Sequence, residues 1–275
     1  MPRTIRQGDS ESRPAVQRSL HSGFTILDLL VSIGVIAVLL SVLVPAVTSA
    51  QAAAQRVACQ SNIRQQAISM AARAFEANDE LPVSIIGTSG DNRTGPRPQD
   101  TLIVRFERHT GFKPGFGRSI VRWDNMGALF AEQYLDAPEV YYCPAHTGEH
   151  PYQRYAEAFR SDSGEIVTNY QFRASASGKK LAKLPPDKTL LANAMRTQAD
   201  YSHGIGNNML KADLSVQWFP DPNGALFASL PINDDDADRS ASGVEDGWDK
   251  MDNFDPGVRD HVDHHDDGDH HQPGG

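Results

Sequence analysis

A long apolar run near the N-terminus, residues 24–47, constrains this chain more than any other feature. As a helix, 24 residues span roughly 36 Å, which exceeds the ~30 Å hydrocarbon core of a bilayer. The run nevertheless carries a carboxylate, Asp28, near its start. A carboxylate within a membrane segment is costly, and such residues are functional candidates by default. The run therefore needs an explanation that also accounts for Asp28.

Three explanations are open for this run. It can be a plain membrane anchor, or a secretory signal peptide that is cut after Ala50, following the small residues TSA. In the third, a leader is removed in front of the run. Residues 1–23 contain four arginines and show no apolar periodicity, so we predict that they are unfolded. Arginines before the span favour a cytoplasmic N-terminus.

The segment GFTILDLLVSIGVIAVLLSVLVPAV resembles the N-terminus of type IV prepilins and type II secretion pseudopilins. The resemblance implies that Gly23 ends the leader and that Phe24 is the first mature residue. Asp28 then takes the place of the fifth-position glutamate of the family, and Pro45 stands at mature position 22. By the same resemblance, a prepilin peptidase cuts after Gly23 and methylates the new N-terminus. Asp28 is then expected to meet the N-terminal amine of a neighbouring subunit, because a buried carboxylate is tolerated beside a cation.

The helix is expected to continue past the membrane through residues 48–77, which are rich in good helix formers, and to end before Pro82. Apolar side chains recur there at steps of three and four, which predicts a face that packs on a globular domain. This stripe comprises Ile63, Ala67, Met70 and Ala74, and we expect it to be widened by Ile68, Ala71 and Phe75.

Three further motifs resemble a planctomycete-type set of pseudopilin-like proteins. VACQSNIRQQ follows the anchor and EVYYCPAHTG lies in mid-chain. His203 and Asp213 stand at the spacing of the H-x9-DG motif for which that set is named, but Leu214 replaces the glycine. We predict a hairpin there with a looser turn than Asp-Gly would give, because Leu214 would be strained at positive φ. We expect His203 to lie before this hairpin and to bond its backbone. The first motif holds Cys59, Ser61, Asn62, Arg64 and Gln65.

The remaining body, residues 78–231, reads as short strands separated by glycine- and proline-rich loops. We therefore predict an α+β fold, in which the long N-terminal helix packs on a small antiparallel-sheet domain. The predicted strands cover 101–107, 118–123, 139–143, 166–172, 189–194 and the late hairpin, and residues 125–135 are a candidate helix.

The C-terminal tail, residues 232–275, is predicted to be a disordered acidic segment. Residues 234–275 hold 14 of the 35 acidic residues and 3 of the 26 Lys/Arg, so the rest of the chain is nearly neutral. This charge balance argues against nucleic acid as a main partner, because phosphate binding needs clustered cations.

The tail also offers candidate metal ligands, with Ca²⁺ as a possible ion. Its acidic residues follow the spacing of an EF-hand-like loop, although Arg239 occupies the glycine position. Cys143 and His146 have C-x-x-H spacing without an evident second pair of ligands. Whether Cys59 meets Cys143 stays open. The tail candidates are Asp234, Asp236, Asp238, Glu245, His261, His264, His265, His270 and His271.

From the sequence we predict a prepilin-like or pseudopilin-like structural subunit or accessory of a type II secretion or type IV pilus-like assembly. Its expected partners are the membrane, the prepilin peptidase and other pilin subunits, with the globular domain in the periplasm and the anchor in the bacterial inner membrane. The alternative is a signal-cleaved periplasmic or secreted protein that binds Ca²⁺ or a transition metal through its tail. Phosphate-binding loops, zincin motifs and nucleophile elbows are absent, so an enzyme is not predicted.

Overall fold

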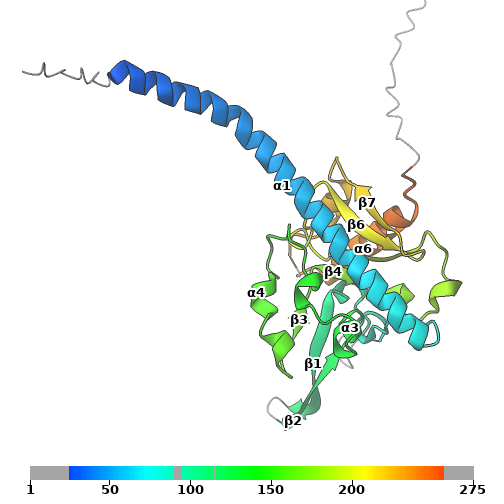
Figure 1. Cartoon of the computed structure of the whole chain (residues 1–275). Helices are drawn as coiled ribbons and strands as arrows, with labels where there is room; N and C mark the ends of the chain where they lie inside the picture. The colour runs from blue at the N-terminus through cyan, green and yellow to red at the C-terminus, as the bar shows by residue number, and fades with distance from the viewer. Residues whose placement is uncertain (1–24, 90–94, 114–115, 234, 257–275) are drawn as a thin grey trace, which may run out of the picture. The chain divides into compact units, whose positions relative to one another are not determined.

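The structure is a computed structural model that describes residues 25–89, 95–113, 116–233 and 235–256. The chain divides into two compact units, at Ala50 and Gln51, and helix α1 contributes to both. Figure 1 shows the elements in chain order. The helices are α1 (Ile26–Glu76), α2 (Ile85–Thr88), α3 (Gly127–Ala131), α4 (Tyr152–Tyr155), α5 (Ala225–Ser229) and α6 (Ala237–Asp252). The strands are β1 (Ile103–Lys113), β2 (Phe116–Trp123), β3 (Ile166–Val167), β4 (Tyr170–Phe172), β5 (Thr189–Asn193), β6 (Gly206–Lys211) and β7 (Val216–Pro220).

Helix α1 runs from Ile26 to Glu76, as the sequence predicted to within two residues, and it continues through Pro45. Its N-terminal half is apolar, and its most apolar 18-residue window contains no buried residue. Ser32, Ser41 and Thr48 each donate their hydroxyl to the carbonyl three residues earlier, which satisfies these polar groups within the helix. Among the described residues this is the one helix long and apolar enough to cross a membrane. It is compatible with a single-pass anchor and equally with a signal sequence.

Among its described residues, the second unit forms two antiparallel sheets rather than one. The first has the strand order β2-β1-β3 and the second the order β4-β5-β6-β7. The predicted strand at 166–172 divides between them, because β3 pairs with β1 whereas β4 pairs with β5. Thr168, at the change of sheet, bonds the Leu102 carbonyl through both its N–H and its hydroxyl, at 2.9 and 3.0 Å.

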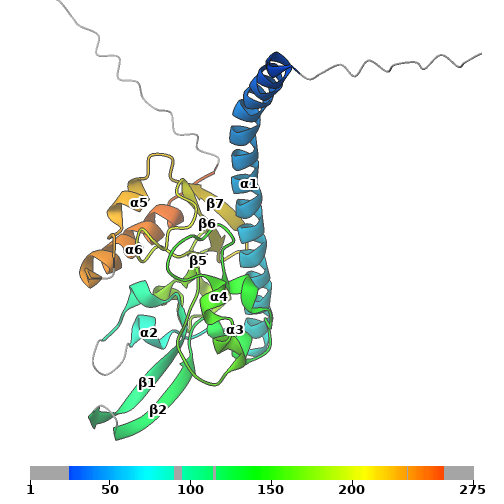
Figure 2. The ribbon, with the colours of Figure 1, turned by 90° about the vertical axis from the view of Figure 1, so that its left-hand side faces the viewer.

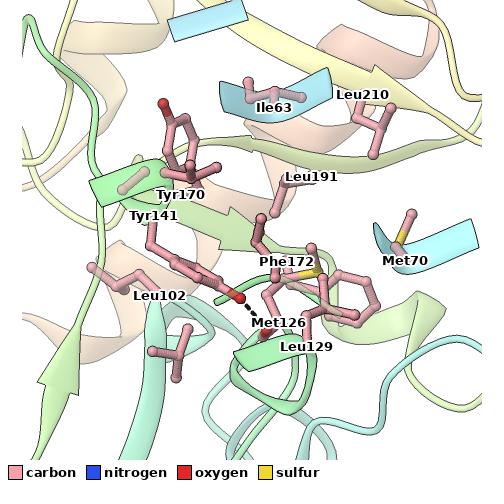
Figure 3. Packing of buried hydrophobic residues seen from close by; sticks show 14 of the residues in the cluster. Ile63, Met70, Leu102, Met126, Leu129, Tyr141, Tyr170, Phe172, Leu191 and Leu210 are labelled. Carbon is pink, nitrogen blue, oxygen red and sulfur yellow. Dashed lines mark hydrogen bonds between the residues drawn. The ribbon is translucent and has the colours of Figure 1, made fainter. Parts of the chain in front are cut away.

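One face of the four-stranded sheet packs against the second half of α1. Ile63 and Met70 of α1 are fully buried, and they share a core with Leu191 and Leu210 of the sheet. Figure 3 shows these side chains together with Tyr170 and Phe172 of β4 and with Tyr141, which lies before β3 in the chain. The predicted stripe is therefore confirmed, but its predicted widening is wrong: Phe75 is 90% exposed. The other residues of that widening are Ile68, which is 64% exposed, and the half-buried Ala71.

Helix α6 covers the opposite face of the same sheet, together with α5 (Figure 2). Val244, Trp248 and Met251 lie at helical spacing and are buried against Met209 and Ala192 of the sheet. Neighbours Leu191 and Ala192 thus face different cores, which explains why every residue of β5 is buried. The prediction of a disordered tail from residue 232 is therefore wrong for α6. Residues 257–275 lie outside the described residues.

The predicted strand at 139–143 is also wrong. Residues Pro138–Tyr141 form a 3₁₀ turn, which Pro138 begins, and Tyr142 then continues in extended conformation. The predicted helix at 125–135 shortens to α3. Further 3₁₀ turns lie at Pro98–Asp100, Ala158–Arg160, Ala174–Ala176 and Leu181–Lys183.

The late hairpin forms as predicted, with a three-residue loop between Lys211 and Ser215. Leu214 N–H donates to the Lys211 carbonyl at 3.0 Å, and Lys211 N–H donates to the Ser215 carbonyl at 2.9 Å. Leu214 has φ of 66°, the conformation that favours glycine at this point of a three-residue hairpin loop. The looser turn is thus confirmed, and Leu214 still carries the strain that glycine would avoid.

Candidate functional site

Three sequence motifs that are far apart in the chain meet at one place in the second unit. Cys59 comes from α1, Cys143 follows the 3₁₀ turn at Pro138–Tyr141, and His203 lies in the loop before β6. Their ligand atoms, two sulfurs and one imidazole nitrogen, all lie within 4.8 Å of one another. Both cysteines are buried and free, and His203 is half-buried. We call these three residues the Cys–Cys–His cluster.

Cys59 is positioned by the helical stripe, because it lies one turn before Ile63 on the buried face of α1. Two side chains of the sheet donate hydrogen bonds to its sulfur. The Tyr170 hydroxyl lies 3.2 Å from Sγ, and the Asn193 amide nitrogen lies 3.0 Å from it. These donors sit on directly paired positions of β4 and β5. The sheet therefore presents two donors to one sulfur.

Cys143 is held against α1 by polar side chains of the helix. Asn62 donates to the Tyr142 carbonyl at 2.9 Å, and Gln66 donates to the Val140 carbonyl at 3.0 Å. Cys143 N–H donates to the Asn169 side chain at 3.2 Å. The polar residues after Cys59 thus hold the segment that carries Cys143. Asn62 belongs to the predicted motif, whereas Gln66 was missed.

His203 turns its Nε2 toward the sulfur of Cys143, at 3.4 Å. The same nitrogen lies 3.2 Å from Nδ2 of Asn208, and the ring meets Trp218 edge to face at 5.6 Å between centroids. Arg56 of α1 in turn covers Trp218, with 4.8 Å from its guanidinium carbon to the ring centroid. The expectation that His203 bonds the hairpin backbone is corrected, because its imidazole contacts side chains. Asp213 lies in the hairpin turn, where its carboxylate accepts from Ser215 N–H.

The cluster favours one negative charge for its two cysteines, with Cys59 as the thiolate. Burial raises the pKa of the Cys59 thiol, but hydrogen bonds from Cys143, His203, Tyr170 and Asn193 outweigh it and hold that pKa well below its ordinary value. The hydrogen bond to Cys59, burial and the adjacent charge raise the pKa of Cys143 far above its usual range. Burial, followed by the charges of the cysteines, likewise raises the pKa of Tyr170, which stays a neutral donor. The geometry therefore suits a Cys59 thiolate beside a Cys143 thiol.

His146, which stands at C-x-x-H spacing from Cys143, does not join the cluster. His146 Nδ1 faces the Ser202 hydroxyl at 3.3 Å, and its Nε2 accepts from His150 N–H at 3.4 Å. Burial lowers the pKa of His146. His203, which lies 60 residues after Cys143, takes the place beside the sulfur that the local spacing assigned to His146.

The N-terminal candidates are described in part. Asp28 and Thr25 form a reciprocal capping box at the start of α1: Asp28 Oδ2 accepts from Thr25 N–H at 3.0 Å, and Thr25 Oγ1 accepts from Asp28 N–H at 3.2 Å. Pro45 lies inside the helix. Gly23 and Phe24 lie outside the described residues.

The described residues of the candidate calcium loop form the start of α6 rather than a loop. Asp236 is the N-cap of α6, where its side chain accepts from Arg239 N–H, and Asp238 and Glu245 are both within the helix. A continuous helix cannot wrap its side chains around one ion as a Ca²⁺ loop does. Asp234 and the five tail histidines, His261, His264, His265, His270 and His271, lie outside the described residues.

Comparisons of the chain with protein-family models, with curated proteins and with solved structures found no match. The fold and the site define an α+β protein with a long N-terminal helix, apolar in its first half, and a largely buried cysteine–histidine cluster to which that helix contributes Cys59. Its functional assignment rests on these residues and their geometry.

Proposed function

We propose that this protein is a prepilin-like or pseudopilin-like subunit, or an accessory, of a type II secretion or type IV pilus-like assembly. A prepilin peptidase removes its leader after Gly23, and residues 24–47 anchor it in the bacterial inner membrane. The globular unit then lies in the periplasm. The observation that carries the proposal is the continuity of α1, whose first half is apolar and whose second half buries one face against the folded unit.

This continuity supports the proposal over the alternative of a cleaved signal peptide. A signal peptide ends at its cleavage site, and nothing requires the residues after it to continue the same helix. Here the helix passes through Ala50 without interruption and reaches Glu76. Its continuation places Cys59 and Ile63 in the core. The proposed anchor and the part of α1 that packs on the folded unit therefore belong to one helix.

The capping box bears on the proposed role of Asp28. In the described chain its carboxylate already accepts the Thr25 N–H and hydroxyl, so it has a role in starting the helix. Cleavage after Gly23 would leave the new amine on the residue next to Thr25. The same carboxylate would then lie near a cation on its own chain, and in an assembly it could exchange that cation for the amine of a neighbour.

The test is the mature N-terminus, read by mass spectrometry from membranes of the native host. We expect a start at Phe24, with a methylated amine. Gly23→Val should block processing, whereas the matched change Gly34→Val, at a helical glycine with open space around it, should leave processing unchanged. A start near Gln51, and blockage by Ala50→Phe instead, would replace the proposal with a secreted protein.

A further inference from the structure

We propose that Cys59, Cys143 and His203 bind one zinc ion. Two cysteine sulfurs and an imidazole nitrogen are the ligand types that zinc prefers, and they come from three distant parts of the chain. In a tetrahedral zinc site, Zn–S bonds of about 2.3 Å and Zn–N bonds of about 2.0–2.1 Å place sulfur and nitrogen about 3.5 Å apart. The 3.4 Å between Cys143 Sγ and His203 Nε2 matches that edge.

Asn208 is the fourth ligand that the structure offers. Its side chain is fully buried, and its Oδ1 has no hydrogen-bond partner within the part of the chain that the structure describes. Its Nδ2 lies 3.2 Å from His203 Nε2. Rotating the amide by half a turn exchanges the two atoms and brings Oδ1 to the ion, while the lone pair of Nε2 becomes a zinc ligand. The exchange pairs an otherwise unsatisfied buried oxygen.

The surroundings fix the ligands in place, as the outer residues of metal sites do. Tyr170 and Asn193 donate to Cys59 Sγ, and Asn193 is itself held because its Oδ1 accepts from Asn208 N–H at 3.0 Å. Trp218 packs on the His203 ring. These contacts restrict the rotamers of two ligands before any ion arrives, which lowers the entropy cost of binding.

A surface cavity lies beside the cluster. A surface cavity of about 430 Å³ is bounded by Cys143 together with Asn62, Tyr142, Pro144 and His146. The cavity therefore reaches one ligand residue of the site directly. The site would be a structural one, because a zinc ion there would tie α1 to the 138–144 segment and to the loop before β6.

The experiment uses the full-length chain without a polyhistidine tag, purified in detergent under reducing, oxygen-free conditions. Zinc is counted by elemental analysis and native mass spectrometry after dialysis with a slight excess of Zn²⁺ and a weak competing chelator. We expect one tightly held zinc per chain in the wild type, and its loss in Cys59→Ser, Cys143→Ser and His203→Ala. His146→Ala is the matched histidine control and should keep the ion. All variants retain the tail histidines, so the difference between them reports on the cluster alone.

Two further measurements separate ligation from a loss of fold. Replacement by Co²⁺ should give thiolate charge-transfer absorption in the wild type and none in Cys59→Ser, with circular dichroism verifying that both are folded. Asn208→Leu should weaken zinc binding about tenfold or more, whereas Asn208→Asp, which keeps an oxygen ligand, should bind at least as tightly as wild type. If reduced, folded wild type holds no more zinc than Cys59→Ser, the proposal is wrong. It is equally overturned if the protein from the native host is lighter by two hydrogens and resists alkylation until it is reduced, because a Cys59–Cys143 disulfide would then occupy both sulfurs.

Discussion

Replacing Asp252 with asparagine tests whether α6 is an integral part of the fold. The Asp252 carboxylate, whose side chain is 17% exposed, accepts three hydrogen bonds: from Arg173 Nη1 at 2.6 Å, from Lys188 Nζ at 2.8 Å and from Thr189 N–H at 2.7 Å. It thereby joins the last turn of α6 to β5 and to the segment after β4. Arg173 is 3% exposed, so loss of the carboxylate leaves a buried cation with a poor partner.

The expected cost follows from these contacts. Removing one partner of a buried ion pair lowers the free energy of unfolding by about 3–5 kcal/mol. The loss is smaller here because the Lys188 side chain is 30% exposed and asparagine keeps one acceptor. We therefore expect Asp252→Asn to lower the free energy of unfolding by about 2–4 kcal/mol at pH 7. The assay is urea unfolding of the full chain in detergent, followed by tryptophan fluorescence, since Trp248 of α6 is buried beside Arg173.

Asp249→Asn is the matched control. Asp249 lies one turn earlier on α6 and contacts the same Arg173, but at 3.4 Å and with 71% of its side chain exposed. Exposed pairs contribute about 0–1 kcal/mol, so this change should have little effect. If the two variants lose equal stability, the idea that α6 is fastened through Asp252 is refuted.

The pH dependence of Asp252 gives a second check. Burial raises its pKa, but the bonds from Lys188 and Thr189 and the charge of Arg173 outweigh burial, so the net pKa lies below its usual value. A lowered pKa in the folded state contributes stability that is present above the unfolded value of about 3.9 and is lost as pH falls through the folded value. The difference between wild type and Asp252→Asn should therefore be constant near neutrality and shrink below about pH 4. A difference that stays constant at low pH would contradict this origin.

Three further predictions use the same unfolding assay. Trp248→Ala, at a side chain that is 1% exposed, should cost about 3–5 kcal/mol, whereas a loosely attached helix would tolerate it with little loss. Leu214→Asn should stay within about 1 kcal/mol of wild type, because relief of strain at φ 66° offsets lost packing, whereas the β-branched Leu214→Val should cost about 1–3 kcal/mol. Burial holds the pKa of His150 below its ordinary value, and Arg196 donates to its Nε2, so stability should fall as pH drops below about 6.5, with a smaller fall in His150→Gln.

The long helix and its buried stripe could be predicted because they depend on local periodicity. The prediction failed for the burial of the residues that flank the stripe. Ile68 and Phe75 are exposed, whereas Gln66 is fully buried beside Ile63 and Met70. Gln66 is buried because its amide bonds the Val140 carbonyl, a partner 74 residues away. Hydrophobicity alone assigns a glutamine to solvent, so a polar residue that is buried for its hydrogen bond is missed.

Helix α6 was missed because net charge outweighed periodicity in the prediction. Seen at helical spacing, Val244, Trp248 and Met251 form an apolar face, and Asp236 supplies an N-cap in front of it. The acidic residues between them, such as Asp246 and Glu245, are exposed on the other face. A segment with many carboxylates can still be amphipathic, and its net charge then describes only the solvated side.

The Cys–Cys–His cluster shows where local patterns stop being sufficient. Cys59 could be assigned to the core, because it lies four residues before Ile63 on the same stripe. Cys143 could not, since a strand through 139–143 would alternate its side chains, whereas the observed 3₁₀ turn and the bonds from Asn62 and Gln66 set its position. His203 required knowledge that its loop returns to α1, which follows from the pairing of β5 with β6. The three residues belong to separate sequence motifs, and their proximity can be recognised only when the pairing of the strands and the phase of the helix are known together. That dependence on long-range geometry is why a ligand set spread over 145 positions, from Cys59 to His203, is invisible to any spacing rule.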